Sequence, residues 1–456
     1  MNTFDLIVIG AGSGLDIAVQ AASQGRKVAL IEPGPMGGTC LNRGCIPSKM
    51  IIHTADLIEE ISTSKKIGLT FTIKKANLQK ITTRASHLVD GDAKEIEEGV
   101  RATKNLTLFK ASAKFIGFKK LLINQQEITA KKIVIAAGAR PSLPNIPGLE
   151  NVPYLTSTQA LRLTKLPESM IIIGGGYIAA ELGHFYGSLG CKVTIIQRGP
   201  LLIPREDKDI SATFTALWKK KYDLICDSTI RSIEKRGRDI IVHTSKKKLH
   251  AQTLLIATGV RPNTDLLNLS KTGVLLNEKE FIIVNQYLET NVSDIYALGD
   301  IAGKFLFKHS ANLEAQTVLK NILETKNIKE SVDYYPMPHA IFTSPQIAGV
   351  GLTEQDVLAQ KPPKQKYLIG KYQYKNTGMG AALAQEHGFV KLIVDAKTKE
   401  ILGCHILGPH ASILLHEVVI AMKANRFRAL DILREAIHVH PSLSEVVQRA
   451  ALSVPI

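Results

Sequence analysis

Short apolar runs that end at glycine alternate along the chain with segments of helical periodicity. Residues 4–10 form one such run, which is typical of a strand buried on both faces of a parallel sheet. Residues 17–23 have the small-residue spacing of a packed helix, and residues 27–32 form a second apolar run that ends at an acid. This order predicts a strand–helix–strand unit whose first turn is the glycine-rich stretch 10–14.

A second copy of this unit follows in the middle of the chain. Its strands are predicted at 170–176 and 192–196, with a helix at 178–189 between them. Each copy is followed by a matching segment in which an apolar strand leads to Gly-x-Arg-Pro, at 133–141 and at 254–262. The duplication predicts two dinucleotide-binding folds and therefore two different nucleotides.

The dinucleotide pattern does not continue to the end of the chain. An apolar strand that leads to Asp300 predicts that the first dinucleotide domain resumes after the second. Beyond it, an alternating strand at 389–394 and a helix at 414–423 predict a further α+β domain. The predicted fold class is α/β, with two Rossmann-like dinucleotide-binding domains and a C-terminal α+β domain. The predicted boundaries are 1–147 for the first part of the first domain, 148–270 for the second domain, 271–335 for the rest of the first domain with a central region, and 336–456 for the α+β domain.

The first glycine-rich turn has most of the features of a dinucleotide fingerprint. Gly10 and Gly12 permit a tight turn and a close approach to a pyrophosphate at a helix N-terminus. Leu15 occupies the third glycine position, and we expect Gly14 to compensate for it. Glu32 ends the second strand at the spacing of an acid that binds a ribose hydroxyl. These features together predict a bound nucleotide.

The second turn is a complete fingerprint, with Gly174, Gly176 and Ala179 at the required spacing. Its second strand ends at Gln197 followed by Arg198, so no acid stands where NAD-specific folds place one. An arginine at this position pairs well with the 2′-phosphate of NADP. The alternative is that Arg198 is an ordinary surface residue, and the same two readings apply to Arg205 nearby.

Composition favours a globular protein, since 45% of the residues are hydrophobic and 21% are charged. No apolar run reaches the roughly 18 residues that a membrane span needs, so we expect no membrane partner. The first residues lead directly into a strand, from which we expect no targeting segment. Five cysteines are too few for a secreted disulfide scaffold, and they favour a reducing, cytoplasmic location.

The net charge of +16 raises the question of a nucleic-acid partner. Lysine runs occur at 219–221 and 246–248, but no zinc-finger or RNA-recognition signature accompanies them. We therefore expect a solvated lysine-rich surface and no nucleic-acid partner. The alternative is that the charge attracts anionic nucleotides or an acidic partner protein.

Two cysteines, Cys40 and Cys45, stand in the run Gly-Gly-Thr-Cys-Leu-Asn-Arg-Gly-Cys-Ile-Pro-Ser-Lys at 37–49. A disulfide between them would close a loop too short to remove much unfolded-state entropy, so it would be a poor structural staple. The run follows a dinucleotide-binding unit closely, so a redox cofactor bound there would lie beside the cysteines. A disulfide in this place is better suited to reversible reduction than to structural support. This position predicts a redox-active disulfide.

Near the C-terminus, His440 is followed by Glu445, and a carboxylate can orient a histidine that acts as a general base. We interpret His438 as structural, and we expect no metal site because no further ligands cluster nearby. Lys49 lies one helical turn after Cys45, and we expect it to pair with Glu181 beside the redox cofactor. The alternative is that Lys49 and Glu181 are ordinary surface charges. Cys191, Cys226 and Cys404 stand alone in apolar segments and are expected to be buried, inert thiols.

With these motifs assembled, the chain resembles the FAD-dependent pyridine nucleotide–disulfide oxidoreductases, a family with the glutathione reductase-like fold. The resemblance covers nearly the whole chain, and the run 38–49 is its most specific part. It implies that Cys40 exchanges with the substrate and that Cys45 lies against the flavin. It also implies that Tyr177 covers the nicotinamide pocket, and that His440, assisted by Glu445, comes from the other subunit of a homodimer.

The resemblance assigns residues to three functions. The predicted catalytic residues are Cys40, Cys45, His440, Glu445, Lys49 and Glu181. The predicted FAD contacts are Gly10, Gly12, Ser13, Gly14, Glu32, Gly38, Thr39, Lys49, Ala137, Gly138 and Asp300. The predicted NAD(P)H contacts are Gly174, Gly176, Tyr177, Ile178, Glu181, Gln197, Arg198 and Gly259.

Different segments of the chain resemble different enzymes of the family. Leu41-Asn42 and the run 45–49 look most like dihydrolipoyl dehydrogenase, although Arg43 replaces the small apolar residue usual there. Residues 308–315 are similar to the mycothione reductase pattern, and Gln197 departs from the acid of NAD-specific lipoyl enzymes. Residues 452–456 lack the cysteine pair of mercuric reductases.

Dihydrolipoyl dehydrogenase, acting on a small dithiol or on a lipoyl domain, is therefore the first hypothesis. An NADPH-dependent mycothione or glutathione reductase is the alternative. A flavin enzyme that reduces oxygen or a quinone would need neither the cysteine pair nor His440, and a non-catalytic redox sensor is the last alternative.

Overall fold

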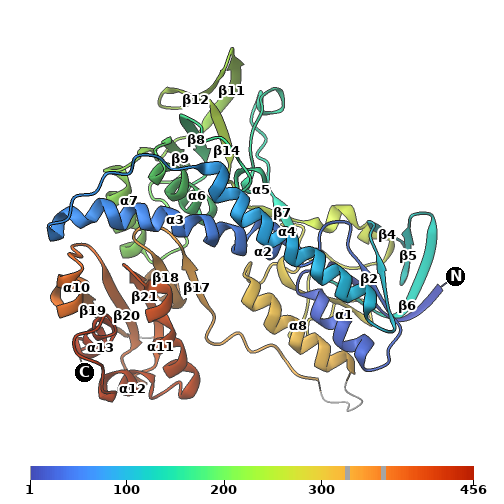
Figure 1. Ribbon diagram of the computed structural model, residues 1–456. Coiled ribbons are helices and arrows are strands. Elements are labelled where there is room, and N and C mark those ends of the chain that lie inside the picture. Colours follow the sequence, from blue (N-terminus) through green and yellow to red (C-terminus); the bar gives the residue numbers. More distant parts are fainter. Residues whose placement is uncertain (1, 324–328, 361–365, 456) are drawn as a thin grey trace. The chain divides into compact units, whose positions relative to one another are not determined.

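The structure is a computed structural model that describes residues 2–323, 329–360 and 366–455 (Figure 1). Its residues form two units. The first unit contains Met1–Ser48, Thr82–Ser142 and Gly259–Tyr334, and the second contains Lys49–Ile81, Leu143–Thr258 and Tyr335–Ile456. The helices α3 (Cys45–Thr63) and α4 (Leu78–Ala102) each contribute residues to both units. The predicted domain boundaries stay a prediction.

The first unit is built on a seven-stranded sheet with the order β3-β2-β1-β6-β5-β4, to which β16 adds beside β6. The pairings of β1, β2, β3, β6 and β16 are parallel, while β4, β5 and β6 form an antiparallel meander. The strands are β1 (Asn2–Ile9), β2 (Val28–Ile31), β3 (Leu106–Phe109), β4 (Ala113–Gly117), β5 (Lys120–Ile123), β6 (Gln126–Ile135) and β16 (Ile295–Ala297), and the helices are α1 (Gly14–Ser23), α2 (Gly38–Arg43) and α8 (Lys308–Leu323).

Two hydrophobic cores lie on the two faces of this sheet, because alternate residues of a strand point to opposite faces. Ile7 and Ile9 of β1 belong to one core, and Leu6 and Val8 belong to the other. All four residues are almost fully buried. This double burial explains why the strand is a continuous apolar run and not an alternating pattern.

The second unit contains a dinucleotide fold with the same plan as the first. Its parallel sheet has the order β10-β9-β8-β14, so that β8, β9, β10 and β14 correspond to β1, β2, β3 and β6. An antiparallel sheet β11-β12-β13 accompanies it. The predicted duplication is thus confirmed. The elements are α5 (Ser157–Ala160), β8 (Ser169–Ile173), α6 (Tyr177–Ser188), β9 (Lys192–Ile196), α7 (Lys208–Lys219), β10 (Asp223–Ile225), β11 (Ile230–Arg236), β12 (Asp239–Thr244), β13 (Lys248–Ala251) and β14 (Thr253–Ile256).

The repeated Arg-Pro segments have a relation that the sequence did not reveal. Their tips form β7 (Ala139–Pro141) and β15 (Val260–Pro262), which pair with each other as a two-stranded antiparallel sheet in the first unit. Arg140 stands opposite Arg261 in this pair.

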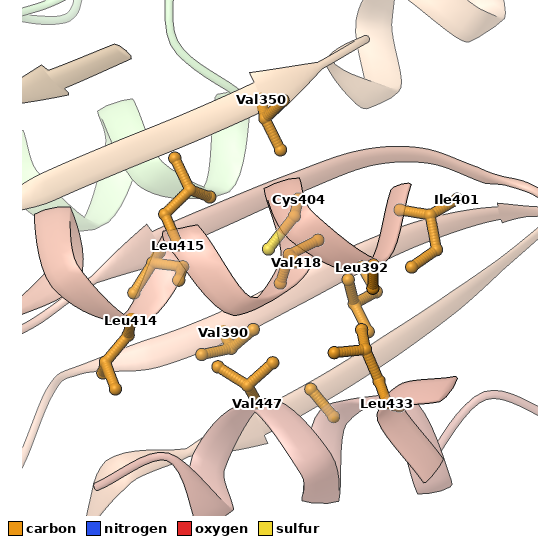
Figure 2. Packing of buried hydrophobic residues seen from close by; sticks show 14 of the residues in the cluster. Val350, Val390, Leu392, Ile401, Cys404, Leu414, Leu415, Val418, Leu433 and Val447 are labelled. Atoms are coloured by element: carbon orange, nitrogen blue, oxygen red, sulfur yellow. The ribbon is translucent and has the colours of Figure 1, made fainter. Parts of the chain in front are cut away.

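The second unit also contains the α+β domain, as predicted. Its antiparallel sheet has the order β17-β18-β21-β20-β19. Figure 2 shows Val390, Leu392 and Cys404 from the sheet packed against Val418 and Val447 from the helices. The elements are β17 (Pro338–Ile341), β18 (Ile347–Gly351), α9 (Glu354–Ala359), β19 (Tyr367–Gln373), α10 (Gly378–Ala382), β20 (Phe389–Asp395), β21 (Ile401–Leu407), α11 (Ala411–Ala424), α12 (Ala429–Glu435) and α13 (Glu445–Leu452).

No helix in the described part of the chain combines the length and the apolar character needed to cross a membrane. Within the same residues, no cluster of three or more histidine, cysteine or acidic side chains could hold a metal ion.

Candidate functional site

The glycine loop of the first dinucleotide fold is shaped by close backbone contacts. Gly10 has a φ of +106°, and a Cβ atom there would lie 2.3 Å from the carbonyl oxygen of Ala136. A Cβ on Gly14 would lie 2.8 Å from a methyl carbon of Val8. Gly14 therefore supplies the close helix–strand contact that the third fingerprint position, Leu15, does not.

The cysteine-bearing helix α2 is docked directly onto this loop. The Gly37 N–H donates a hydrogen bond of 3.0 Å to the Ala11 carbonyl oxygen. Gly38 has a φ of +65°, and a Cβ atom on it would lie 2.7 Å from the Cα atom of Gly12. The first unit thus holds the glycine loop and the start of the cysteine run in contact, with no side chain between them.

Asn42 fixes the turn that precedes α2. Its buried amide donates to the carbonyl oxygens of Met36 at 2.7 Å and of Gly38 at 2.9 Å. Asn42 was noted only for its likeness to dihydrolipoyl dehydrogenase inside the cysteine run, and no pattern predicted this structural function.

Glu32 is oriented by the same loop. One of its carboxylate oxygens accepts the Ala11 N–H at 2.9 Å, and the other accepts the Gly34 N–H at 2.8 Å. Each oxygen keeps further lone pairs for a ligand hydroxyl. The carboxylate is therefore held ready at the end of β2, where a ribose diol would lie.

Asp300 lies just after β16, and burial raises the pKa of its carboxyl group. No residue in the described part of the chain donates a hydrogen bond to it. Its neighbour Glu314 accepts the Gly299 N–H at 2.6 Å and the Tyr334 hydroxyl at 2.7 Å. A half-buried carboxyl group to which no described residue donates can accept a ligand hydroxyl.

The helix α8 contributes a cation, Lys308, that was not among the predicted cofactor contacts. The ammonium of Lys308 donates to the Ser13 hydroxyl at 2.9 Å, and this hydroxyl donates to the Asn312 amide oxygen at 3.0 Å. Ser13 belongs to the glycine loop, so Lys308 brings positive charge to the loop that is predicted to bind a pyrophosphate. Lys308 begins the segment 308–315 that is similar to the mycothione reductase pattern, but that resemblance gave it no contact with the cofactor.

The two cysteines lie on either side of a break between helices. Gly44 separates α2 from α3, and a Cβ atom on it would lie 2.8 Å from the Thr39 carbonyl oxygen. A hydrogen bond with Cys45 is the main reason that the pKa of the Cys40 thiol is raised, and burial adds to it, whereas Lys308 acts in the opposite direction. Cys45 is more exposed than Cys40.

The other three cysteines are buried in hydrophobic cores, as predicted. Burial raises the pKa of Cys191 to about 12 and also raises those of Cys226 and Cys404. Figure 2 shows the sulfur of Cys404 among aliphatic side chains. These thiols stay protonated and unreactive at neutral pH.

In the second unit, Lys49 and Glu181 form the predicted pair. The lysine ammonium lies 2.8 Å and 2.7 Å from the two carboxylate oxygens, and 4.5 Å from the centroid of the Phe342 ring. Glu181 also accepts the Phe342 N–H at 3.1 Å. This arrangement holds the ammonium four residues beyond Cys45 on the same helix, α3.

The second glycine loop repeats the geometry of the first. Gly174 has a φ of +114°, and a Cβ atom there would lie 2.3 Å from the Ala257 carbonyl oxygen. The Gln197 side chain covers Gly175 and donates to the Leu201 carbonyl oxygen at 3.2 Å. Arg198 is exposed and forms no ion pair with any described residue.

Tyr177 is the first residue of α6, directly after Gly176, and Ile178 follows it half-buried. The Tyr177 hydroxyl donates to Glu206, which is also paired with His339. Neither Glu206 nor His339 belongs to a motif, so neither was predicted to lie at the site.

His440 and Glu445 come together at the start of α13. The His440 Nδ1 lies 3.0 Å from one oxygen of Glu445, whose other oxygen accepts the Ser442 N–H at 3.1 Å. The hydrogen bond with His440 is the main reason that the pKa of Glu445 is lowered. The His440 side chain is 77% exposed, so it is accessible to a reactant from outside this chain. His438 instead bridges the Ala436 carbonyl oxygen and Glu417, in keeping with a structural role.

The remaining predicted residues fall into both units. Thr39 is part of α2, and the carbonyl oxygens of Ala137 and Gly138 accept hydrogen bonds from Asn263 at 2.7 Å and 3.1 Å. Gly259, predicted for the second nucleotide, lies in the first unit, whereas Gly174 and Gly176 lie in the second. The first unit thus gathers the cysteines with the first glycine loop, and the second gathers Lys49, Glu181, Tyr177 and the His440–Glu445 pair.

Comparison with known proteins agrees with this arrangement. The "Pyridine nucleotide-disulphide oxidoreductase" family matches residues 4–322, and its dimerisation domain matches residues 337–451. Mycothione reductase of Mycobacterium tuberculosis is 34% identical over 465 aligned positions, which cover 100% of both chains. Dihydrolipoyl dehydrogenase of Chlamydia trachomatis is 33% identical, with 99% of this chain and 97% of the relative covered.

Among solved structures, the flavoprotein disulfide reductase RclA of Escherichia coli is similar over 99% of this chain and 100% of its own, with a TM-score of 0.88 and 28% identity. These matches extend over both dinucleotide folds and the α+β domain.

Proposed function

Because the chain belongs to the pyridine nucleotide–disulphide oxidoreductase family, we propose that it is a dihydrolipoyl dehydrogenase whose redox disulfide is formed by Cys40 and Cys45. Enzymes of this family use FAD and NAD(P)H. The proposal is carried by one observation, the contact of Gly38 with Gly12, which joins the cysteine helix to the glycine loop. When bound, FAD supplies a two-electron carrier between the cysteines and the nicotinamide.

The residues of the first unit suit FAD. Gly10 and Gly38 have no side chains, so a pyrophosphate could lie directly against the backbone of the loop. Lys308 adds positive charge beside this backbone. Glu32 and Asp300 offer carboxyl groups for sugar and ribityl hydroxyls.

Thiol–disulfide exchange assigns a separate task to each cysteine. A substrate thiolate attacks Cys40, so that a bond forms between these two sulfurs while the bond from Cys40 to Cys45 breaks and Cys45 leaves as a thiolate. The second substrate thiolate then displaces Cys40, which releases the oxidised substrate and leaves both cysteines reduced. Two electrons have moved from the substrate dithiol to the enzyme disulfide, which is thereby reduced to a dithiol, and NAD(P)⁺ is their final acceptor.

His440 is the proposed proton acceptor for the substrate thiols. Thiolates, not thiols, are the nucleophiles, so a base is needed at neutral pH. Glu445 fixes the ring through Nδ1, which leaves Nε2 to take the proton. The dimerisation-domain match supports a homodimer, and we place His440 at the cysteines of the partner subunit. We place the enzyme in the reducing cytoplasm.

An NADPH-dependent reductase of small disulfides, such as mycothione or glutathione disulfide, is the second candidate. The observation in its favour is the end of β9, where Gln197 and the exposed Arg198 replace an acid. The 34% identity to mycothione reductase adds to it.

One set of assays tests the proposal. The purified enzyme is given dihydrolipoamide with NAD⁺ or NADP⁺, and lipoamide, mycothione or glutathione disulfide with NADH or NADPH. We expect turnover with the lipoyl pair and none in Cys40→Ser. Turnover with glutathione or mycothione disulfide alone would replace the first candidate with the second. Turnover of a quinone or oxygen that Cys40→Ser retains would contradict both.

A further inference from the structure

A row of basic residues crosses the five-stranded sheet of the α+β domain. Strand pairing places His339 beside Gly349, Gly349 beside His405, and His405 beside Lys391. Lys391 is buried, and its ammonium lies 2.9 Å from the carboxylate of Asp207, the N-cap residue of α7. The row therefore holds the acidic segment that begins α7 against the sheet.

At one end of this row, Glu206 holds Tyr177. Glu206 is 1% exposed, and one of its oxygens lies 2.9 Å from Nε2 of His339. Its other oxygen accepts the Tyr177 hydroxyl. The rings of Tyr177 and His339 are stacked, with centroids 6.2 Å apart and planes inclined by 13°. The phenol of Tyr177 is thus fixed at its hydroxyl and across its face.

Charge and burial support this contact. Burial and the neighbouring Glu206 raise the pKa of Tyr177, so its hydroxyl stays a donor, although Arg205 acts in the opposite direction. Burial alone would raise the pKa of Glu206, but the hydrogen bonds from His339 and Tyr177 outweigh it and lower that pKa. Glu206 is therefore a charged acceptor, which makes a stronger hydrogen bond than a neutral one.

The sheet fixes His339 in turn. A Cβ atom on Gly349 would lie 2.7 Å from Cε1 of His339 and 3.1 Å from Nδ1 of His405, so only glycine leaves room for both rings. Burial lowers the pKa of His405, which stays neutral, with its Nε2 at 2.9 Å from the Leu352 carbonyl oxygen. The position of the Tyr177 ring is thereby linked to the packing of the α+β domain.

We infer that Glu206 and His339 are positioning residues that latch Tyr177 and thereby weaken the binding of the nicotinamide nucleotide. The inference rests on the proposed function and on the role that the family resemblance implies for Tyr177, which is to cover the nicotinamide pocket. A nicotinamide ring that occupies this pocket must displace the phenol, and the hydrogen bond to Glu206 then breaks.

The test is the affinity of the oxidised holoenzyme for NAD⁺ and for NADP⁺, measured by titration calorimetry. Tyr177→Phe removes the hydroxyl and keeps the ring against His339. We expect it to bind the preferred nucleotide roughly tenfold more tightly, the size of effect that a hydrogen bond to a charged group produces. The KM for the nucleotide should fall while the KM for the thiol substrate stays the same.

Tyr186→Phe is the matched control, since this tyrosine lies on the same helix but its hydroxyl donates to the Ala160 carbonyl oxygen. Its affinity should equal that of the wild type. His339→Leu removes the partner that holds Glu206 and stacks on Tyr177, so it should free the phenol and also tighten nucleotide binding. If both Tyr177→Phe and His339→Leu bind the nucleotide no more tightly than the wild type, the latch is refuted while the proposed function stands. A wild type that binds neither nucleotide would refute the proposed function and the latch together.

Discussion

Replacing Gly38 by alanine adds one methyl group at the contact between the cysteine helix and the glycine loop. The backbone there has a φ of +65°, which costs an alanine about 1–2 kcal/mol. The new Cβ would also lie 2.7 Å from Cα of Gly12, well inside van der Waals contact. Overpacking of this kind costs about 1–3 kcal/mol, and the loop can relieve it only by moving away from α2.

This movement should deform the FAD site. If the overpacking cost falls on the bound form, FAD binds roughly ten- to a hundredfold more weakly in Gly38→Ala. Gly25→Ala is the control, because Gly25 has a φ of +81° with no atom within 4 Å of its Cβ position, so it carries the backbone strain without the collision. The ratio of flavin to protein after dialysis, and the titration of apoprotein with FAD, measure the difference. Equal FAD affinities in Gly38→Ala and Gly25→Ala would refute the idea that this contact shapes the site.

Three further predictions concern the dimer, the nucleotide and the acid stability. Mixing inactive Cys45→Ser chains with inactive His440→Ala chains should restore part of the activity through heterodimers, and no recovery after verified subunit exchange would place both residues in one chain's site. Arg198→Ala should raise the KM for NADP(H) roughly tenfold and leave that for NAD(H) unchanged, whereas equal effects would make Arg198 a surface residue. The Glu354 N–H and Lys391 outweigh burial and lower the pKa of Asp207, so its stabilisation is present above about pH 4 and is lost as the pH falls through the folded-state pKa. Thermal unfolding of Asp207→Asn should therefore depend less on pH in the acid range, and an unchanged pH profile would show that the pair does not stabilise the fold.

Local patterns predicted much of the fold because they follow from burial and backbone geometry. The apolar run at β1 is continuous since Ile7 and Val8 face different cores, and the same reason makes β8 recognisable. The glycines at 10 and 174 mark turns where a side chain would collide with a carbonyl oxygen. The Lys49–Glu181 pair was predicted from the place of Lys49 one helical turn after Cys45 and was also implied by the family resemblance, and the structure brings its two side chains together.

Contacts between distant segments were not predictable in this way. The strands β7 and β15 have three residues each, too few to show a period, and they pair across more than a hundred positions. Lys308 and His339 gain their significance only from the partners that folding supplies, Ser13 and Glu206. The docking of Gly38 on Gly12 likewise depends on tertiary packing, although both glycines were singled out separately.

The most direct test of the central claim is an anaerobic reductive titration of the purified enzyme with dithionite, followed by flavin absorbance. If Cys40 and Cys45 form a redox disulfide beside FAD, the wild type takes up twice the reducing equivalents of Cys45→Ser before its flavin is fully reduced, because the disulfide accepts two electrons as the flavin does. A long-wavelength band from a thiolate beside the flavin should appear midway in the wild type, be absent in Cys45→Ser, and persist in Cys40→Ser. Equal uptake by the wild type and both serine variants, with no such band, would contradict the account.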